Sequence, residues 1–264
     1  MKANILFRMA GLVFFINIFL SACTPHFYQP KPLEPVLLTK ENQLKLNAIA
    51  NIDMNTVSIA YSPKNNLGVQ LGIGSFHNKS FSTDNAGRET IYLNEYYSNP
   101  YVSAGYYKHL SQDVLFEAYG GIGMYRYKNT AVSYLKNMKN INLFIQPSIA
   151  FVNKNFDAAF TVRVDYLNRT KTIITDSVLS TDDRIKYQFL DYKNYFFFQP
   201  GITLKAGFKY VKFQFQLSHS IPFSNSYKSI YGYGYRFGLD PIRNDNRLVY
   251  GFGITVELND LFKK

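Results

Sequence analysis

The stretch that decides the fold is FKYVKFQFQLSHSI, residues 208–221. Val211, Phe213, Phe215 and Leu217 alternate with Lys212, Gln214, Gln216 and Ser218. A period of two puts apolar residues on one face of a strand and polar residues on the other. A helix repeats every 3.6 residues and does not fit this run. The stretch therefore predicts a β-strand with two unlike faces.

The same alternation recurs along the chain, for example from Phe156 to Tyr166 and from Leu248 to Leu258. It predicts about ten strands, near residues 42–52, 55–62, 67–77, 100–109, 113–127, 140–152, 155–168, 193–206, 209–221 and 247–258. Pro147 and Pro200 lie inside two similar predicted strands. Because proline cannot donate to a strand ladder, we expect a β-bulge at each.

The connections between these strands alternate between short and long. Residues 63–66, 110–112, 153–154 and 207 are short and rich in turn formers, whereas 78–99, 128–139, 169–192 and 222–246 are long. Membrane barrels have short periplasmic turns and long outer loops, and an even strand number puts both ends of the barrel on the short-turn side. We therefore expect an all-β fold over residues 42–260, an antiparallel up-and-down barrel of about ten strands, with eight to twelve as the range.

The composition of the chain limits the classes of partner that we expect it to bind. Charged residues make up 18% of the chain and aromatics 17%, and the formal charge is +11. That charge falls to +9 if Lys2 and Arg8 leave with a signal peptide. A basic excess favours anionic lipid, acidic glycans or nucleic acid, but no run of five like charges supports nucleic acid. Membrane lipid and an envelope protein or glycan are the expected partners.

The N-terminus reads as an export signal. Basic residues precede an apolar run from Met9 to Leu20, which is too short to span a bilayer. Leu20 to Cys23, containing the chain's single cysteine, resembles the lipobox of bacterial lipoproteins. The resemblance implies that residues 1–22 are a signal peptide and that Cys23 carries lipid, including palmitate. Residues 23–41 then form a proline-rich extended tether, and we expect the N-terminus on the periplasmic side.

The polar faces of the predicted strands suit a confined lumen. They carry glycines, long polar side chains and roughly balanced charges, which could pair structurally or line a pore. Apolar faces with tyrosines near strand ends suit lipid contact. A soluble, lipocalin-like or sandwich domain tethered by Cys23 remains the alternative. The predicted lumen charges are Lys45, Glu117, Asp157, Arg163, Asp165, Lys205, Lys212 and Glu257.

On these features the chain resembles the small outer-membrane β-barrel superfamily, in particular lipobox-bearing barrel proteins of the Bacteroidota. The repeated FIQPSI and FFQPGI strands at 144–149 and 197–202, the 207–217 hairpin and the segment after Cys23 carry the resemblance. It implies a place in the Gram-negative outer membrane more than a reaction, since such barrels largely lack an assigned activity.

The sequence shows no arrangement of residues that indicates a catalytic or metal-binding site. The four histidines show no metal-ligand spacing, and neighbouring positions in a strand point to opposite faces, which separates His219 from Ser218 and Ser220. We expect no enzyme activity, no metal and no cofactor. The expected role is structural or ligand-binding through the long loops, and a small-solute channel is the alternative.

Overall fold

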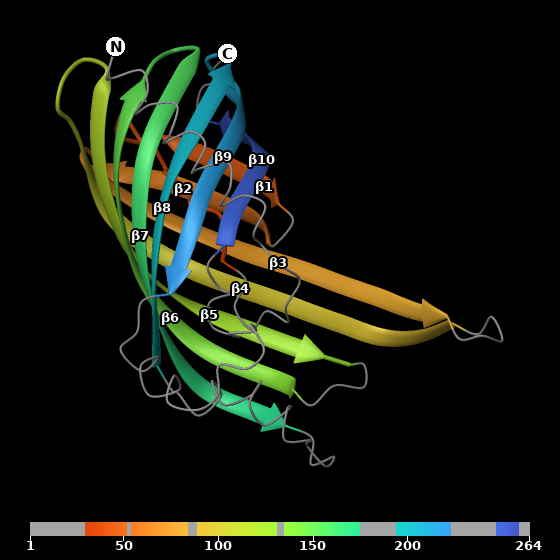
Figure 1. Ribbon diagram of the computed structural model, residues 1–264. Coiled ribbons are helices and arrows are strands. Elements are labelled where there is room, and N and C mark those ends of the chain that lie inside the picture. The colour runs from red at the N-terminus through yellow and green to blue at the C-terminus, as the bar shows by residue number, and fades with distance from the viewer. Residues whose placement is uncertain are drawn as a thin grey trace, which may run out of the picture.

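The chain folds into one closed antiparallel barrel of ten strands, as the sequence predicts. The computed structural model describes residues 30–51, 54–83, 89–130, 135–174, 194–222 and 247–258 (Figure 1). Each strand pairs with its neighbours in chain order, and β1 closes the barrel against β10. The strands are β1 (Leu44–Asn51), β2 (Asn55–Lys64), β3 (Leu67–Thr83), β4 (Glu89–His109), β5 (Val114–Asn129), β6 (Leu135–Val152), β7 (Phe156–Ile174), β8 (Asn194–Gly207), β9 (Val211–Pro222) and β10 (Arg247–Glu257).

The strands differ in length, so the barrel wall is uneven at the long-loop end. Strands β3 to β7 run well past the ends of β1, β2 and β10 there, as the projecting β3–β4 hairpin shows (Figure 1). The expected loop at 78–99 was wrong: β3 reaches Thr83 and β4 starts at Glu89, paired Asn78↔Glu95. The long loop expected at 128–139 was also wrong, because β5 ends at Asn129 and β6 starts at Leu135, and β7 ends later than expected. Backbone pairing sustains these ribbons although their side chains are polar, and such side chains resemble those of a loop.

The apolar faces point outward and the polar faces point inward. Leu71, Phe213 and Phe252 on the outside are 57%, 65% and 62% exposed. Gln146 and Gln199 on the inside are 4% and 0% exposed. The described residues contain no helix that is long and apolar enough to cross a membrane. The barrel is therefore inverted relative to a soluble one, whose apolar residues fill the interior.

The two strand prolines cause no bulge, contrary to expectation. The register between β6 and β7 is the same before and after Pro147, from Ile145↔Val164 to Ser148↔Thr161. That between β8 and β9 is likewise unchanged across Pro200. On one side of each of these strands, the pair that would contain the proline is missing. On the other side the pairs Ala118↔Pro147 and Val162↔Pro200 remain. The missing donor thus interrupts one ladder without inserting a residue.

Candidate functional site

The lumen is occupied by the chain's own N-terminal region. Residues 30–38, called here the plug segment, are all buried. Leu33 and Leu38 are 0% exposed, and Lys31 and Glu34 only 2% and 4%. Residues 39–43 then turn into β1. The sequence had assigned residues 23–41 to a tether, and the described part of that region packs inside the barrel up to Leu38.

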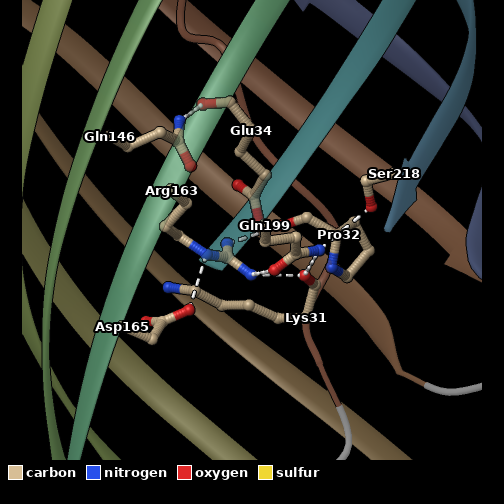
Figure 2. Close-up of polar contacts among 8 residues, drawn as sticks. All are labelled: Lys31, Pro32, Glu34, Gln146, Arg163, Asp165, Gln199 and Ser218. Carbon is tan, nitrogen blue, oxygen red and sulfur yellow. Dashed lines mark hydrogen bonds and ion pairs between the residues drawn. The ribbon is translucent and has the colours of Figure 1, made fainter. Parts of the chain in front are cut away.

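Side chains of the barrel wall bind the backbone carbonyls of the plug segment. Arg163 on β7 donates from Nη1 to Pro32 O at 3.0 Å and from Nη2 to Lys31 O at 2.6 Å (Figure 2). Gln199 on β8 also donates to Lys31 O, at 3.3 Å. The remaining donors are Gln216 to Leu33 O, Gln146 to Glu34 O at 3.0 Å, Lys205 to Pro35 O at 3.2 Å and Lys45 to Leu37 O.

The side chains of the wall provide hydrogen bonds that an extended proline-rich strand cannot make within itself. Such a strand makes no internal backbone hydrogen bonds, and its prolines have no N–H to offer. Buried carbonyls nevertheless need partners. The long amide and basic side chains of the lumen provide those partners, so this wall is built to hold a peptide backbone.

Glu117 on β5 binds the two amides at the base of the plug segment. Its Oε1 accepts from Val36 N at 2.9 Å and its Oε2 from Leu37 N at 2.8 Å. Glu117 is 0% exposed. Leu37 has a φ of 53°, in the left-handed region that costs a non-glycine residue roughly 1–2 kcal/mol. The bidentate contact with the carboxylate holds the backbone in this bend.

The upper end of the plug segment is held through side chains. Glu34 Oε2 accepts from Tyr101 Oη at 2.6 Å and from Gln70 Nε2 at 3.0 Å. The Lys31 ammonium lies 3.5 Å from the centroid of the Tyr101 ring and 4.0 Å from that of Phe144. A desolvated cation over an aromatic face is stabilised by about 2 kcal/mol. Both charged side chains of the segment are thus bound by the wall.

Apolar contacts complete the fit at the short-turn end. Val36, Leu37 and Leu38 pack with Tyr107, Leu115, Tyr119 and other buried wall residues. Glycines make room for the segment and for wall side chains beside it. A Cβ on Gly201 would lie 2.7 Å from Leu33 Cδ1 and 2.5 Å from Ser218 Cβ, and one on Gly68 would lie 2.8 Å from Leu38 Cδ1 and 2.1 Å from Tyr119 Oη. The lumen is shaped around these side chains and packed at their level.

A second apolar cluster lies in the lumen nearer the long-loop end. Its tyrosines pack ring against ring, with centroids of Tyr97 and Tyr127 5.0 Å apart. Each member is at most 4% exposed. The cluster comprises Met54, Tyr97, Tyr125, Tyr127, Met138, Leu167 and Phe197.

The structure places all eight predicted lumen charges inside the barrel or at its short-turn rim. Arg163 and Asp165 form a buried pair at 2.8 Å, both 1% exposed. Glu117, Lys205 and Lys45 bind the plug segment, as described above.

The remaining three charges pair near the short-turn end. Lys212 pairs with Asp157 at 2.6 Å, and Glu257 pairs with Lys40 at 3.1 Å.

Sequence reasoning missed the plug segment; it placed the glutamines on the polar faces of the strands but not as partners of this segment. The available signal was the spacing of Pro30, Pro32 and Pro35 around apolar residues, which a solvated tether does not need. Within the described parts of the chain, no group of histidine, cysteine or acidic residues could hold a metal ion. Cys23 lies outside the described residues, as do the connections at 84–88, 131–134, 175–193 and 223–246.

Comparison with known proteins identifies neither a family nor an activity for this chain. No protein-family model and no curated relative matches the chain. Among solved structures, the N-terminal β-barrel domain of Pseudomonas aeruginosa OprF is 11% identical, with a TM-score of 0.31. The match covers 83% of this chain and 100% of that one. The NanC porin is 8% identical, with a TM-score of 0.37, and the match covers 81% and 100%. Neither resemblance carries an argument about activity.

Proposed function

We propose that the protein is a lipid-anchored barrel of the Gram-negative outer membrane whose lumen is sealed by its own N-terminal segment. Its role is structural or ligand-binding, through the connections at the long-loop end, rather than catalytic. The occupied lumen is the observation that carries this proposal.

The outer surface supports the membrane location. Large apolar side chains are exposed on strands around the barrel, for example Leu71 on β3 and, on the adjacent strands β6 and β7, Ile145 and Phe160, at 57%, 55% and 51%. Contiguous apolar surface of this extent is unfavourable in water. A membrane-spanning sheet must have no unpaired strand edge in the lipid, and the closed barrel meets this requirement. A tethered soluble barrel would instead expose a polar surface.

The sealed lumen argues against the channel that the sequence leaves open as an alternative. Six of the eight carbonyls from Lys31 to Leu38 accept hydrogen bonds from the wall. Displacing these six carbonyls together would leave the buried side chains that donate to them without acceptors. Each unsatisfied group costs roughly 1–3 kcal/mol. A solute therefore meets a bound peptide rather than water.

Planar-bilayer recording tests this point. The purified full-length protein is expected to show no steady conductance, and a variant lacking residues 30–38 is expected to conduct. A second deletion, of residues 24–29 alone, controls for shortening of the N-terminus and should stay silent. Steady conductance from the full-length protein would favour the channel instead.

Lipid attachment at Cys23 is the other part of the proposal. The lipobox-like residues before Cys23 and the absence of any other cysteine support it. Metabolic labelling with palmitate, compared with a Cys23→Ser variant, tests it directly. Gel mobility with and without boiling tests the barrel separately. A band that does not shift after boiling would contradict a closed membrane barrel. Envelope proteins or glycans are the proposed partners.

A further inference from the structure

Three basic side chains form a row across the outer face of neighbouring strands, near their long-loop ends. Arg126 of β5 lies directly opposite Lys139 of β6, and Lys139 lies directly opposite Lys171 of β7. Directly opposite residues share a face, with Cβ atoms about 5 Å apart. Arg126 and Lys171 are exposed and Lys139 is half-buried, whereas Asn140, the next residue of β6, is buried on the lumen side. Arg126, Lys139 and Lys171 are called here the basic row.

A β-bulge places Lys171 in this row. Arg169 is buried on the lumen side, and residues two apart in a regular strand share a face, so a regular β7 would point Lys171 inward. Lys139 pairs with Lys171. The next residue of β6 pairs with Arg169, which leaves Thr170 as the extra residue of a bulge. The bulge turns Lys171 to the outer face, where it is exposed.

The basic row is unfavourable for the barrel by itself, because like charges directly opposite each other destabilise a sheet. The acidic residues of β5, β6 and β7 are all buried in the lumen, namely Glu117, Asp157 and Asp165. No salt bridge between described residues involves the row. Arg126 donates from Nε and Nη2 to Met124 Sδ at 3.2 and 3.1 Å, and a thioether is a weak acceptor. The described parts of the chain thus leave this positive charge without a counter-charge.

The basic row lies directly beyond the apolar belt of the outer face. On β6 the outward residues from Phe151 to Ile141 are all apolar. At roughly 3.3 Å per residue and a tilt near 40°, these positions rise about 25 Å, which is the height of the apolar band of a membrane barrel. Lys139 is the next outward residue and lies about 5 Å beyond Ile141. Lipid headgroups begin at this depth.

We propose that the basic row binds the phosphate group of a membrane lipid in the leaflet at the long-loop end. The acyl chains of this lipid lie along the apolar belt of β5, β6 and β7. Arg126 binds phosphate oxygens through its guanidinium fork, and the two lysines add point charges. Neighbouring members of the row differ in height by about 3 Å, which their long side chains span. The inference rests on the proposed membrane placement and names the chemistry of the lipid partner.

Fluorescence quenching by brominated lipid tests the proposal. The chain contains no tryptophan, so Ile141→Trp gives a single reporter, two residues from Lys139 on the same face. The full-length protein is reconstituted in phosphatidylcholine vesicles with increasing brominated phosphatidic acid. Both leaflets hold the same mixture, so the direction of insertion does not matter. We expect a preference for phosphatidic acid of at least about fivefold, the factor that one basic residue near anionic lipid contributes.

Two triple variants in the Ile141→Trp background separate the basic row from the net charge. The first replaces the row by glutamine and should abolish the preference: Arg126→Gln, Lys139→Gln and Lys171→Gln. It should retain heat-modifiable mobility, because it removes repulsion between opposite residues. The second removes the same charge from exposed lysines at the short-turn end and should retain the preference: Lys108→Gln, Lys154→Gln and Lys209→Gln.

The outcomes separate this proposal from the membrane placement. If brominated phosphatidylcholine alone does not quench the tryptophan, the outer face does not contact lipid and the membrane placement fails. Quenching without a preference for phosphatidic acid overturns the role of the basic row and leaves the placement standing. An equal loss of preference in both triple variants shows attraction by net charge alone and contradicts the proposal. Loss of the preference in excess inorganic phosphate would indicate a site for free anions and overturn the assignment to lipid.

Discussion

The buried pair of Arg163 and Asp165 gives the sharpest test of how the plug segment is held. Arg163 donates to Asp165 Oδ2 at 2.8 Å, to Gln199 Oε1 at 2.5 Å and to two plug carbonyls. Arg163→Met leaves the Asp165 carboxylate buried without its guanidinium partner. Removing one partner of a buried pair costs about 3–5 kcal/mol, which lowers the folding equilibrium by about two to four orders of magnitude.

The double variant Arg163→Met with Asp165→Leu separates the two contributions. It loses the plug and Gln199 contacts of Arg163 and the remaining contacts of Asp165, but it leaves no buried carboxylate without its guanidinium. We expect it to be more stable than Arg163→Met alone, because replacing a buried ion pair by apolar residues is often neutral. Equilibrium unfolding in urea, in phospholipid vesicles, measures each free energy by heat-modifiable mobility and circular dichroism.

A matched control comes from an exposed pair. Lys40, with its side chain 49% exposed, pairs with Glu257, and Lys40→Met should cost less than about 1 kcal/mol. If Arg163→Met costs no more than Lys40→Met, the guanidinium is not what holds the segment in the lumen. A double variant less stable than the single one would equally refute the argument from the lost guanidinium partner of Asp165.

Four further predictions follow from the same contacts. Glu117→Gln should destabilise the barrel by about 1–3 kcal/mol in the same unfolding assay, because an amide cannot accept from both plug amides. Gly201→Val should destabilise the barrel in the same assay, because even its Cβ would meet Ser218 Cβ and Leu217 O of β9 as well as Leu33 Cδ1; unchanged stability would contradict the tight fit. Phe160→Arg, on the outer face, should cost about 2–4 kcal/mol in vesicles and little in detergent. Cys23→Ser should abolish palmitate labelling yet leave heat-modifiable mobility unchanged, since Cys23 precedes the first strand, which starts at Leu44, in the sequence.

The sequence alone determined the architecture. Alternation such as that of residues 211–217 specifies a strand with unlike faces, and its recurrence over ten segments specifies the strand number. The alternation also pointed to eight charged positions on the polar faces, but it did not predict the burial of Lys31 and Glu34. These properties are local, because side chains two positions apart in a strand share a face whatever the rest of the chain does.

Only the tertiary structure decided what fills the lumen. Nothing in residues 30–38 identifies Arg163, Gln199 or Glu117 as partners, because those residues come from different strands and meet only when β1 closes against β10. The lengths of β3 and β4 also escaped prediction, since backbone pairing extends polar ribbons that read as loops. Closure brings together side chains more than 100 residues apart, and the proline-rich stretch that reads as a tether is thereby bound as the plug of the barrel.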